Sequence, residues 1–336
     1  MHAKRFFAAA ALAALSALHA LPARAGAGDA DTLRQRALQQ FGRVEAAPAA
    51  ERESPEARLG RALFWDTRIS ADNRTSCASC HAAADGGADR RSKPVDARGK
   101  TMPRHSQSVF NAMQQPLLRW LGDRSDAAKM AEGLLTGPLG FATREDAQAA
   151  LQRAGYGERF AAVYGDAAGA SGVELYGRAI AAYQATLRTP AAFDRFLAGD
   201  ARALNERQRA GLRRFMDTGC AACHGGPLLG GRGFQRFGLT RDYAGVTGSD
   251  PVDPGRFAIT GKEEDRHVFR VPMLRNVAHT APYFHDGSVA TLPAAVRAMG
   301  ELQLGRRLGD TEVDEIVAFL GALSGEAPAH YAPPAP

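Results

Sequence analysis

The sequence has few cysteines, few tryptophans and no long apolar run beyond its first residues. Only 4 of the 336 residues are cysteine and 2 are tryptophan, and aromatic residues make up 7%. A dense disulfide framework is therefore excluded, because such scaffolds are much richer in cysteine. After residue 25 no segment reaches the roughly 20 apolar residues of a membrane-spanning helix, so we expect no membrane span. The remaining composition, 45% hydrophobic and 23% charged, is typical of a folded globular protein.

The chain also lacks a block of consecutive basic residues, although its formal net charge is +6. Part of this charge lies in residues 1–25, where a basic start precedes a short apolar run and an Ala-Arg-Ala triplet. That order is typical of a cleaved secretory signal peptide, and its removal would take three basic residues with it. We therefore expect export to the periplasm and no nucleic-acid partner.

The four cysteines fall into two Cys-x-x-Cys-His pentapeptides, at 77–81 and 220–224. This pattern is typical of covalent c-type haem attachment, in which two thiols bond the vinyl groups of one porphyrin and the histidine binds the iron. A zinc site shared by both pairs is disfavoured, since about 140 residues separate them. A redox Cys-x-x-Cys pair needs no following histidine, yet both copies have one. We predict two covalent haems, and their binding residues are Cys77, Cys80, His81, Cys220, Cys223 and His224.

Apolar residues that recur three and four positions apart predict a mainly helical protein. One amphipathic helix is expected before each pentapeptide, at 55–65 and at 204–216. In the second of these helices, Asn205 with Gln208 predicts a capping box, and Gly219 predicts the helix end. Both pentapeptides would therefore follow directly on a helix.

Further helices are expected at 125–135, 145–154, 174–187 and 311–323. In the last of them, Thr311 with Asp314 predicts the N-terminal cap. Long irregular loops, rich in glycine, proline and charge, are expected between the helices, mainly at 82–104 and 225–272. With one pentapeptide in each half, the sequence predicts two cytochrome c-like domains, each binding one covalent haem, at 26–195 and 196–330.

Several stretches of the chain resemble the bacterial dihaem cytochrome c peroxidase / MauG superfamily, and the resemblance covers roughly residues 52–325. The most specific stretches are 63–70, 193–200, 211–220, 268–276 and 280–287. In that family the N-terminal haem reacts with hydrogen peroxide and the C-terminal haem relays electrons. The resemblance therefore implies a peroxidatic first domain and an electron-transfer second domain.

The resemblance also implies roles for individual residues. Met299 matches the sixth ligand of the relay haem, where peroxidases have methionine and the MauG branch has tyrosine. Trp120 matches a tryptophan that carries electrons between the haems. A calcium site is implied at Thr280 and Pro282, with His105 where the family typically has asparagine. Because calcium prefers oxygen ligands, the imidazole of His105 is an unfavourable replacement.

Two departures from the family concern the peroxidatic site. Residues 82–104 contain no histidine, so the displaceable distal ligand of many peroxidases is missing. The positions of the family's distal glutamate and glutamine hold Gly140 and Met130, neither of which transfers a proton. Glu132 is the nearest carboxylate that could serve as the acid–base group, and Asp146 is another.

The leading prediction is a periplasmic dihaem peroxidase that reduces hydrogen peroxide with electrons from a small cytochrome c or cupredoxin. One alternative is a MauG-like enzyme that uses peroxide-derived high-valent haems to oxidise a protein substrate, which the missing distal histidine favours. Another is a dihaem electron carrier without catalysis, which the missing glutamate favours. Met299, in place of tyrosine, favours the peroxidase. The sequence leaves open whether the chain forms a homodimer.

Overall fold

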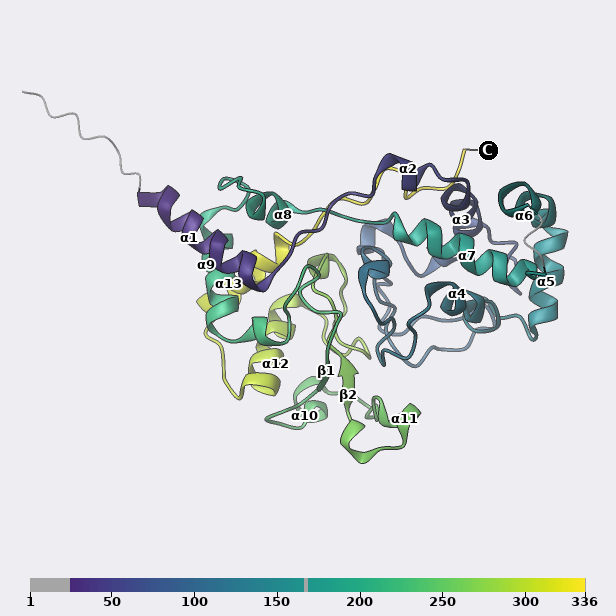
Figure 1. Cartoon of the computed structure of the whole chain (residues 1–336). Coiled ribbons are helices and arrows are strands. Elements are labelled where there is room, and N and C mark those ends of the chain that lie inside the picture. Colours follow the sequence, from purple (N-terminus) through teal and green to yellow (C-terminus); the bar gives the residue numbers. More distant parts are fainter. Residues whose placement is uncertain (1–24, 166–168, 336) are drawn as a thin grey trace, which may run out of the picture.

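The computed structural model describes residues 25–165 and 169–335, and these residues form a mainly helical fold, as predicted (Figure 1). Residues 1–24 of the predicted signal peptide 1–25 lie outside the described residues. Within the described part of the chain, no helix has both the length and the apolar character needed to cross a membrane. The helices form two groups, which lie on opposite sides of Figure 1.

The first group surrounds helix α7, Gly172–Ala185, which begins with a capping box between Ser171 and Glu174. Helices α3 and α4 pack closely against α7, because Gly60 and Gly177 carry no side chain at the contacts; a Cβ at either would collide with a backbone carbonyl of the partner helix. The core buries Phe64 with other apolar side chains. The helices around α7 are α3 (Pro55–Trp65), α4 (Ala127–Thr136), α5 (Arg144–Arg153) and α6 (Tyr156–Tyr164).

The second group is built on helices α9, Glu206–Asp217, and α13, Asp310–Gly321, which pack against each other. At Gly211 the backbone of α9 approaches the carbonyl of Glu315 in α13, so that any larger residue would force the helices apart. Their core includes the ring of Phe319, which is fully buried. The other helices of this group are α1 (Ala25–Gln40), α8 (Ala192–Leu197) and α12 (Leu292–Leu304).

The segment 225–272 is largely irregular, as expected, but it also contains short regular elements. Strands β1 and β2 pair antiparallel, with Phe234 opposite Arg270. The strands lie between the two helix groups and below them in Figure 1, next to α10 and α11. The bounds of these elements and of the short helix α2 are Phe234–Arg236 (β1), Val268–Arg270 (β2), Tyr243–Thr247 (α10), Phe257–Thr260 (α11) and Ala49–Arg52 (α2).

Both ends of the described chain pack against the helix group that is distant in sequence. Leu33 and Phe41, in and just after α1, belong to the core of the second group. Tyr331, near the other end, packs in the core of the first group, and its hydroxyl donates to the carbonyl of His81. The domain bounds 26–195 and 196–330 stay a prediction. The N-terminal segment packs on the second helix group and the C-terminal segment on the first, so the two halves exchange their terminal segments.

The predicted helices at 125–135, 145–154, 174–187 and 311–323 correspond to α4, α5, α7 and α13 with ends shifted by at most two residues. The capping box of α9 is confirmed: Asn205 Oδ1 accepts from the Gln208 N–H, and Gln208 Oε1 accepts from the Asn205 N–H, both at 2.9 Å. Gly219 follows the end of α9 with a φ of 94°, as predicted. The predicted N-terminal cap of the last helix is wrong. Helix α13 starts at Asp310, and Glu312 rather than Asp314 accepts from the backbone N–H of Gly309, at 3.0 Å.

Candidate haem sites

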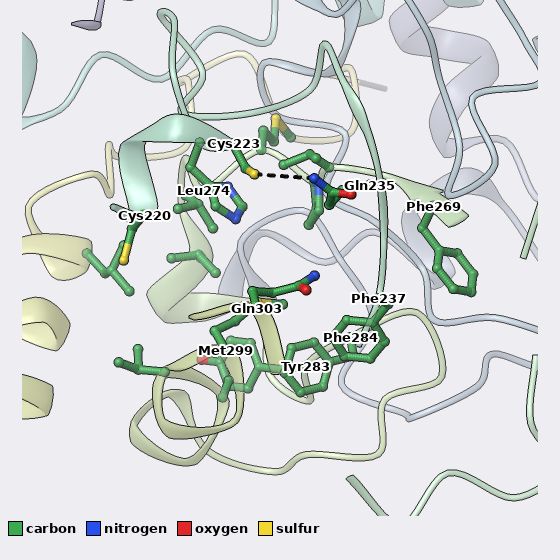
Figure 2. Close-up of a pocket in the computed structure, with 18 of the residues that line it drawn as sticks. Cys220, Cys223, Gln235, Phe237, Phe269, Leu274, Tyr283, Phe284, Met299 and Gln303 are labelled. Carbon is green, nitrogen blue, oxygen red and sulfur yellow. Dashed lines mark hydrogen bonds between the residues drawn. The ribbon is translucent and has the colours of Figure 1, made fainter. Parts of the chain in front are cut away.

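Each pentapeptide lies in the wall of its own cavity. The larger cavity, about 400 Å³, is lined by Cys220, Cys223 and His224 and by mostly apolar side chains from α9, α12, α13 and the segment 269–285. In Figure 2, Met299, Tyr283 and Phe284 lie across this cavity from Cys223. An apolar cavity beside two thiols that are free in the structure fits a covalently attached porphyrin.

His224 is held in the orientation that an iron ligand needs. Its Nδ1 lies 3.1 Å from the carbonyl oxygen of Leu229, and because a carbonyl only accepts, Nδ1 carries the proton. The Nε2 lone pair is then available for a metal. Burial also lowers the pKa of His224, which favours the neutral, metal-binding form.

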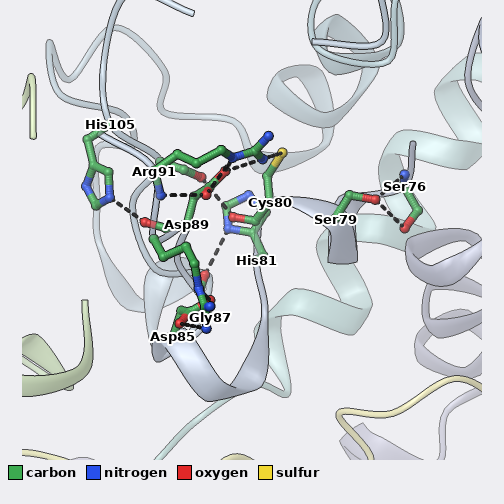
Figure 3. Close-up of polar contacts among 11 residues, drawn as sticks. Ser76, Ser79, Cys80, His81, Asp85, Gly87, Asp89, Arg91 and His105 are labelled. Atoms are coloured by element: carbon green, nitrogen blue, oxygen red, sulfur yellow. Dashed lines mark hydrogen bonds and ion pairs between the residues drawn. The ribbon is translucent and has the colours of Figure 1, made fainter. Parts of the chain in front are cut away.

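The smaller cavity, about 250 Å³, is lined by the first pentapeptide and repeats this arrangement. His81 Nδ1 lies 2.9 Å from the carbonyl oxygen of Gly87 (Figure 3), so Nε2 again remains for a metal. Burial lowers the pKa of His81 and raises the pKa of the Cys77 thiol to about 12. A neutral imidazole is the form that binds iron.

Met299 and Trp120 lie where the sequence predicts. Met299, on α12, lines the larger cavity together with His224, from which it is separated by 75 residues of sequence. Trp120 lines both cavities. Its indole Nε1–H donates to the carbonyl of His105 at 2.8 Å, which fixes the ring between the two sites. The ligand and relay roles stay predictions that this placement supports.

The residues predicted for calcium all line the larger cavity: His105, Thr280 and Pro282. The ring Nε2 of His105 is 2.6 Å from the carbonyl oxygen of Asp89 (Figure 3). The backbone carbonyl of His105 accepts from the indole of Trp120. Over residues 25–165 and 169–335, no group of three or more His, Cys, Asp or Glu side chains could hold a metal ion. The calcium site therefore stays a prediction, and it would have to rely on backbone oxygens.

Glu132 is on α4 but does not line the smaller cavity, whereas Met130 and Leu134 of the same helix do. Its buried carboxylate is 3.0 Å from the Lys129 ammonium and 2.8 Å from the Arg144 guanidinium. The pair with Arg144 directs the carboxylate toward α5. Proton transfer by Glu132 stays a prediction that its contacts do not support.

Asp146, the second carboxylate considered, closes a capping box at the start of α5 with Thr143 and does not line the smaller cavity either. The carboxylate that does line it is Asp123, alone among the Asp and Glu residues that the structure describes. One oxygen of Asp123 pairs with Arg119 and Arg124, at 3.1 and 3.0 Å. The other, Oδ1, is buried without a hydrogen-bond partner in the described structure.

Sequence reasoning missed Asp123, and it assigned no role to two buried groups of the larger cavity. Arg270 is 1% exposed, and His285 is 2% exposed with its Nε2 unpaired among the described residues. Both line the larger cavity. The resembling stretches 268–276 and 280–287 contain these residues, but no spacing or motif indicates that they are buried or where they point.

The fold and the two cavities define a mainly helical, cytochrome-like protein with two candidate haem sites. A family model described as "Di-haem cytochrome c peroxidase" matches residues 54–202, which include the first pentapeptide. Relatives extend this similarity over most of the chain. Cytochrome c551 peroxidase of Pseudomonas aeruginosa is 41% identical over 276 residues, which cover 80% of this chain and 79% of that protein. The chain therefore belongs to the di-haem cytochrome c peroxidase family.

Other relatives cover both branches of the family. Cytochrome c551 peroxidase of Nitrosomonas europaea is 38% identical, over 81% of this chain and 80% of that protein. Methylamine utilization protein MauG of Methylorubrum extorquens is 29% identical, over 86% and 84%. Among solved structures, a MauG-like protein associated with microbial copper homeostasis has a TM-score of 0.72 and 26% identity, over 86% of this chain and 96% of that one. The chain is a peroxidase-type oxidoreductase of a family whose cofactor is haem.

Proposed function

We propose that this protein is a periplasmic dihaem peroxidase with two covalent c-type haems, which reduces hydrogen peroxide with electrons from a small cytochrome c or cupredoxin. The observation that carries the proposal is the position of Trp120, which lines both cavities and thus offers an aromatic bridge between them. The names of relatives about 40% identical, cytochrome c peroxidases, support the same activity. When bound, the first haem would supply an iron that reacts with peroxide, and the second an iron that exchanges single electrons.

The residues of the chain divide this work between the two cavities. In the larger one, His224 and Met299 would hold the iron, and a thioether ligand raises its reduction potential. The exposed position of Cys223 opens this cavity toward solvent, where a small redox donor can approach. In the smaller one, His81 would hold the iron, and the cavity would provide the space in which peroxide reacts.

The reaction consumes two electrons and two protons for each peroxide and gives two waters, so the smaller cavity needs a proton-transferring group. Because Gly140 and Met130 occupy the family's acid and amide positions, we propose Asp123 for this role. Its buried, unpaired Oδ1 can take a proton from one peroxide oxygen and return it to the other. Arg119 and Arg124 bind the second carboxylate oxygen and hold the side chain in place.

A MauG-like oxidation of a protein substrate is the second candidate. The loop 82–104 contributes Pro94, Val95 and Met102 to the wall of the smaller cavity but no histidine. His81 and His105 are the histidines that line this cavity in the described structure, and the ring of His105 is engaged with a backbone carbonyl. An iron site without a displaceable histidine would accept peroxide in the resting state.

One stopped-flow experiment separates the candidates. The haem-loaded protein is mixed with hydrogen peroxide, with and without a reduced small cytochrome c. Rapid, repeated oxidation of the donor is the result expected of the peroxidase. A long-lived spectral change at both haems without donor turnover would favour the MauG-like reaction, and the absence of any spectral change would leave only electron transfer.

A further inference from the structure

Arg270, at the end of β2, is a buried cation without an acidic partner in the described structure. Its side chain is 1% exposed. The guanidinium donates to three neutral oxygens: the carbonyl of Arg119 at 2.8 Å, and the side-chain oxygens of Gln107, at 3.1 Å, and Gln115. In the described residues, no carboxylate oxygen lies within 4.0 Å of a guanidinium nitrogen of Arg270. The positive charge is therefore hydrogen-bonded but not neutralised.

The neighbouring Arg275 shows the usual solution for a buried arginine. It is also 1% exposed, and its two terminal nitrogens bind the carboxylate of Asp194 at 2.7 and 2.9 Å. An uncompensated buried charge is strongly unfavourable, and burial accordingly lowers the pKa of Arg270 to about 10. The guanidinium still carries its charge at neutral pH, and a nearby anion would compensate it.

The side chains around the larger cavity supply no such anion. Arg270 lines this cavity, and the described lining residues include no Asp or Glu. An anionic group in the cavity would compensate this charge. A guanidinium has five N–H donors in a planar fork, and the protein oxygens accept from three of them. Two donors remain, which suits a carboxylate.

We propose that Arg270 binds a propionate carboxylate of the haem attached to Cys220 and Cys223. The inference rests on the proposed haem attachment and adds a specific anchor to it. Gln107 and Gln115 line both cavities and act as positioning residues, since their side-chain oxygens orient the guanidinium.

The pairing has an electrostatic consequence for the second haem. A cation at the propionate offsets its negative charge and so favours the reduced, less positive iron. Loss of Arg270 would leave the propionate uncompensated in a poorly solvated cavity. The reduction potential of the second haem should then fall, while that of the first changes less.

The test compares Arg270→Gln, Arg270→Lys and Arg236→Gln in the haem-loaded protein. Arg236, exposed on the paired strand β1, is the matched control, because its loss removes the same charge from a solvated position. The pyridine haemochrome assay and peptide mass first establish two haems per chain, a result that tests the attachment independently. Spectroelectrochemical titration and the propionate bending band in resonance Raman spectra then report on Arg270.

We expect Arg270→Gln to lower the potential of the second haem and shift its propionate band, and Arg236→Gln to leave both at the wild-type values. An Arg270→Gln protein with two haems and wild-type potential and propionate band would overturn the assignment. If that variant does not fold, Arg270→Lys, which keeps the charge but not the planar fork, should still shift the propionate band. An unchanged band in Arg270→Lys would overturn the assignment as well.

Discussion

The buried ion pair between Asp194 and Arg275 should be the polar contact whose loss most weakens the fold around the second haem site. The exposed fractions of the two side chains are 6% and 0%. The Asp194 carboxylate also accepts from the backbone N–H groups of Val44 and Ala191, both at 2.7 Å. Arg275 further donates to the carbonyl of Pro227 at 2.8 Å. The pair thus connects the segment after α1, the start of α8 and the loop that follows His224.

Asp194→Asn removes the negative charge and replaces one acceptor oxygen with an NH₂ group that faces a donor. Removing one partner of a buried ion pair typically costs about 3–5 kcal/mol, because the other charge stays buried and unpaired. With a slope of about 3 kcal/mol per M of urea, the unfolding midpoint should fall by about 1 M or more. Urea unfolding of the haem-loaded protein, followed by circular dichroism, measures this change.

A matched control is Asp314→Asn, which breaks the 2.8 Å pair between Asp314 and Arg207. These side chains are 58% and 60% exposed, so solvent screens the pair and its loss should cost less than about 1 kcal/mol. Equal and small midpoint shifts in Asp194→Asn and Asp314→Asn would refute the reasoning, since burial is the difference between the two pairs.

Three further predictions concern the haem sites. Met299→Ala should abolish the methionine-to-iron charge-transfer band near the red end of the oxidised spectrum; a band that persists would exclude Met299 as the ligand. Trp120→Phe should slow electron transfer from the second haem to the first by roughly tenfold or more, or about 1.4 kcal/mol in the barrier, in flash-reduction experiments; an unchanged rate would argue for a path that avoids the indole. Asp123→Asn should slow the reaction with peroxide by about 100-fold or more in stopped-flow traces at constant haem content. Glu132→Gln should instead mainly lower the urea midpoint of unfolding, by the equivalent of about 1 kcal/mol, because its partners Lys129 and Arg144 are half exposed. A larger kinetic effect of Glu132→Gln than of Asp123→Asn would reverse the assignment.

The features that could be predicted from the sequence are local along the chain. The two pentapeptides carry their chemistry within five residues. The capping box of Asn205 and Gln208 depends on backbone groups three residues apart, and it is confirmed. The cap of α13 was wrong because Thr311 and Glu312 both lie near the helix start, and the sequence pattern does not distinguish which side chain reaches the free N–H groups.

The structure places the residues whose roles depend on the resemblance in different surroundings. Trp120 and Met299 lie at the cavities as expected, because the segments that carry them occupy the expected place in the fold. Glu132 was chosen for its nearness in sequence to the missing acid. A helix, however, turns successive side chains to different faces, and the face of Glu132 is directed at Lys129 and Arg144.

The composition and motifs were sufficient to predict a mainly helical protein with two Cys-x-x-Cys-His pentapeptides, because helix periodicity and the pentapeptide pattern both depend on residues that are close in sequence. The exchange of terminal segments between the two halves, the carboxylate of Asp123 in the smaller cavity and the unneutralised Arg270 in the larger one emerged only in three dimensions. Each arises from contacts between segments far apart in the chain. Burial and charge compensation are properties of that packing, and no single segment encodes them.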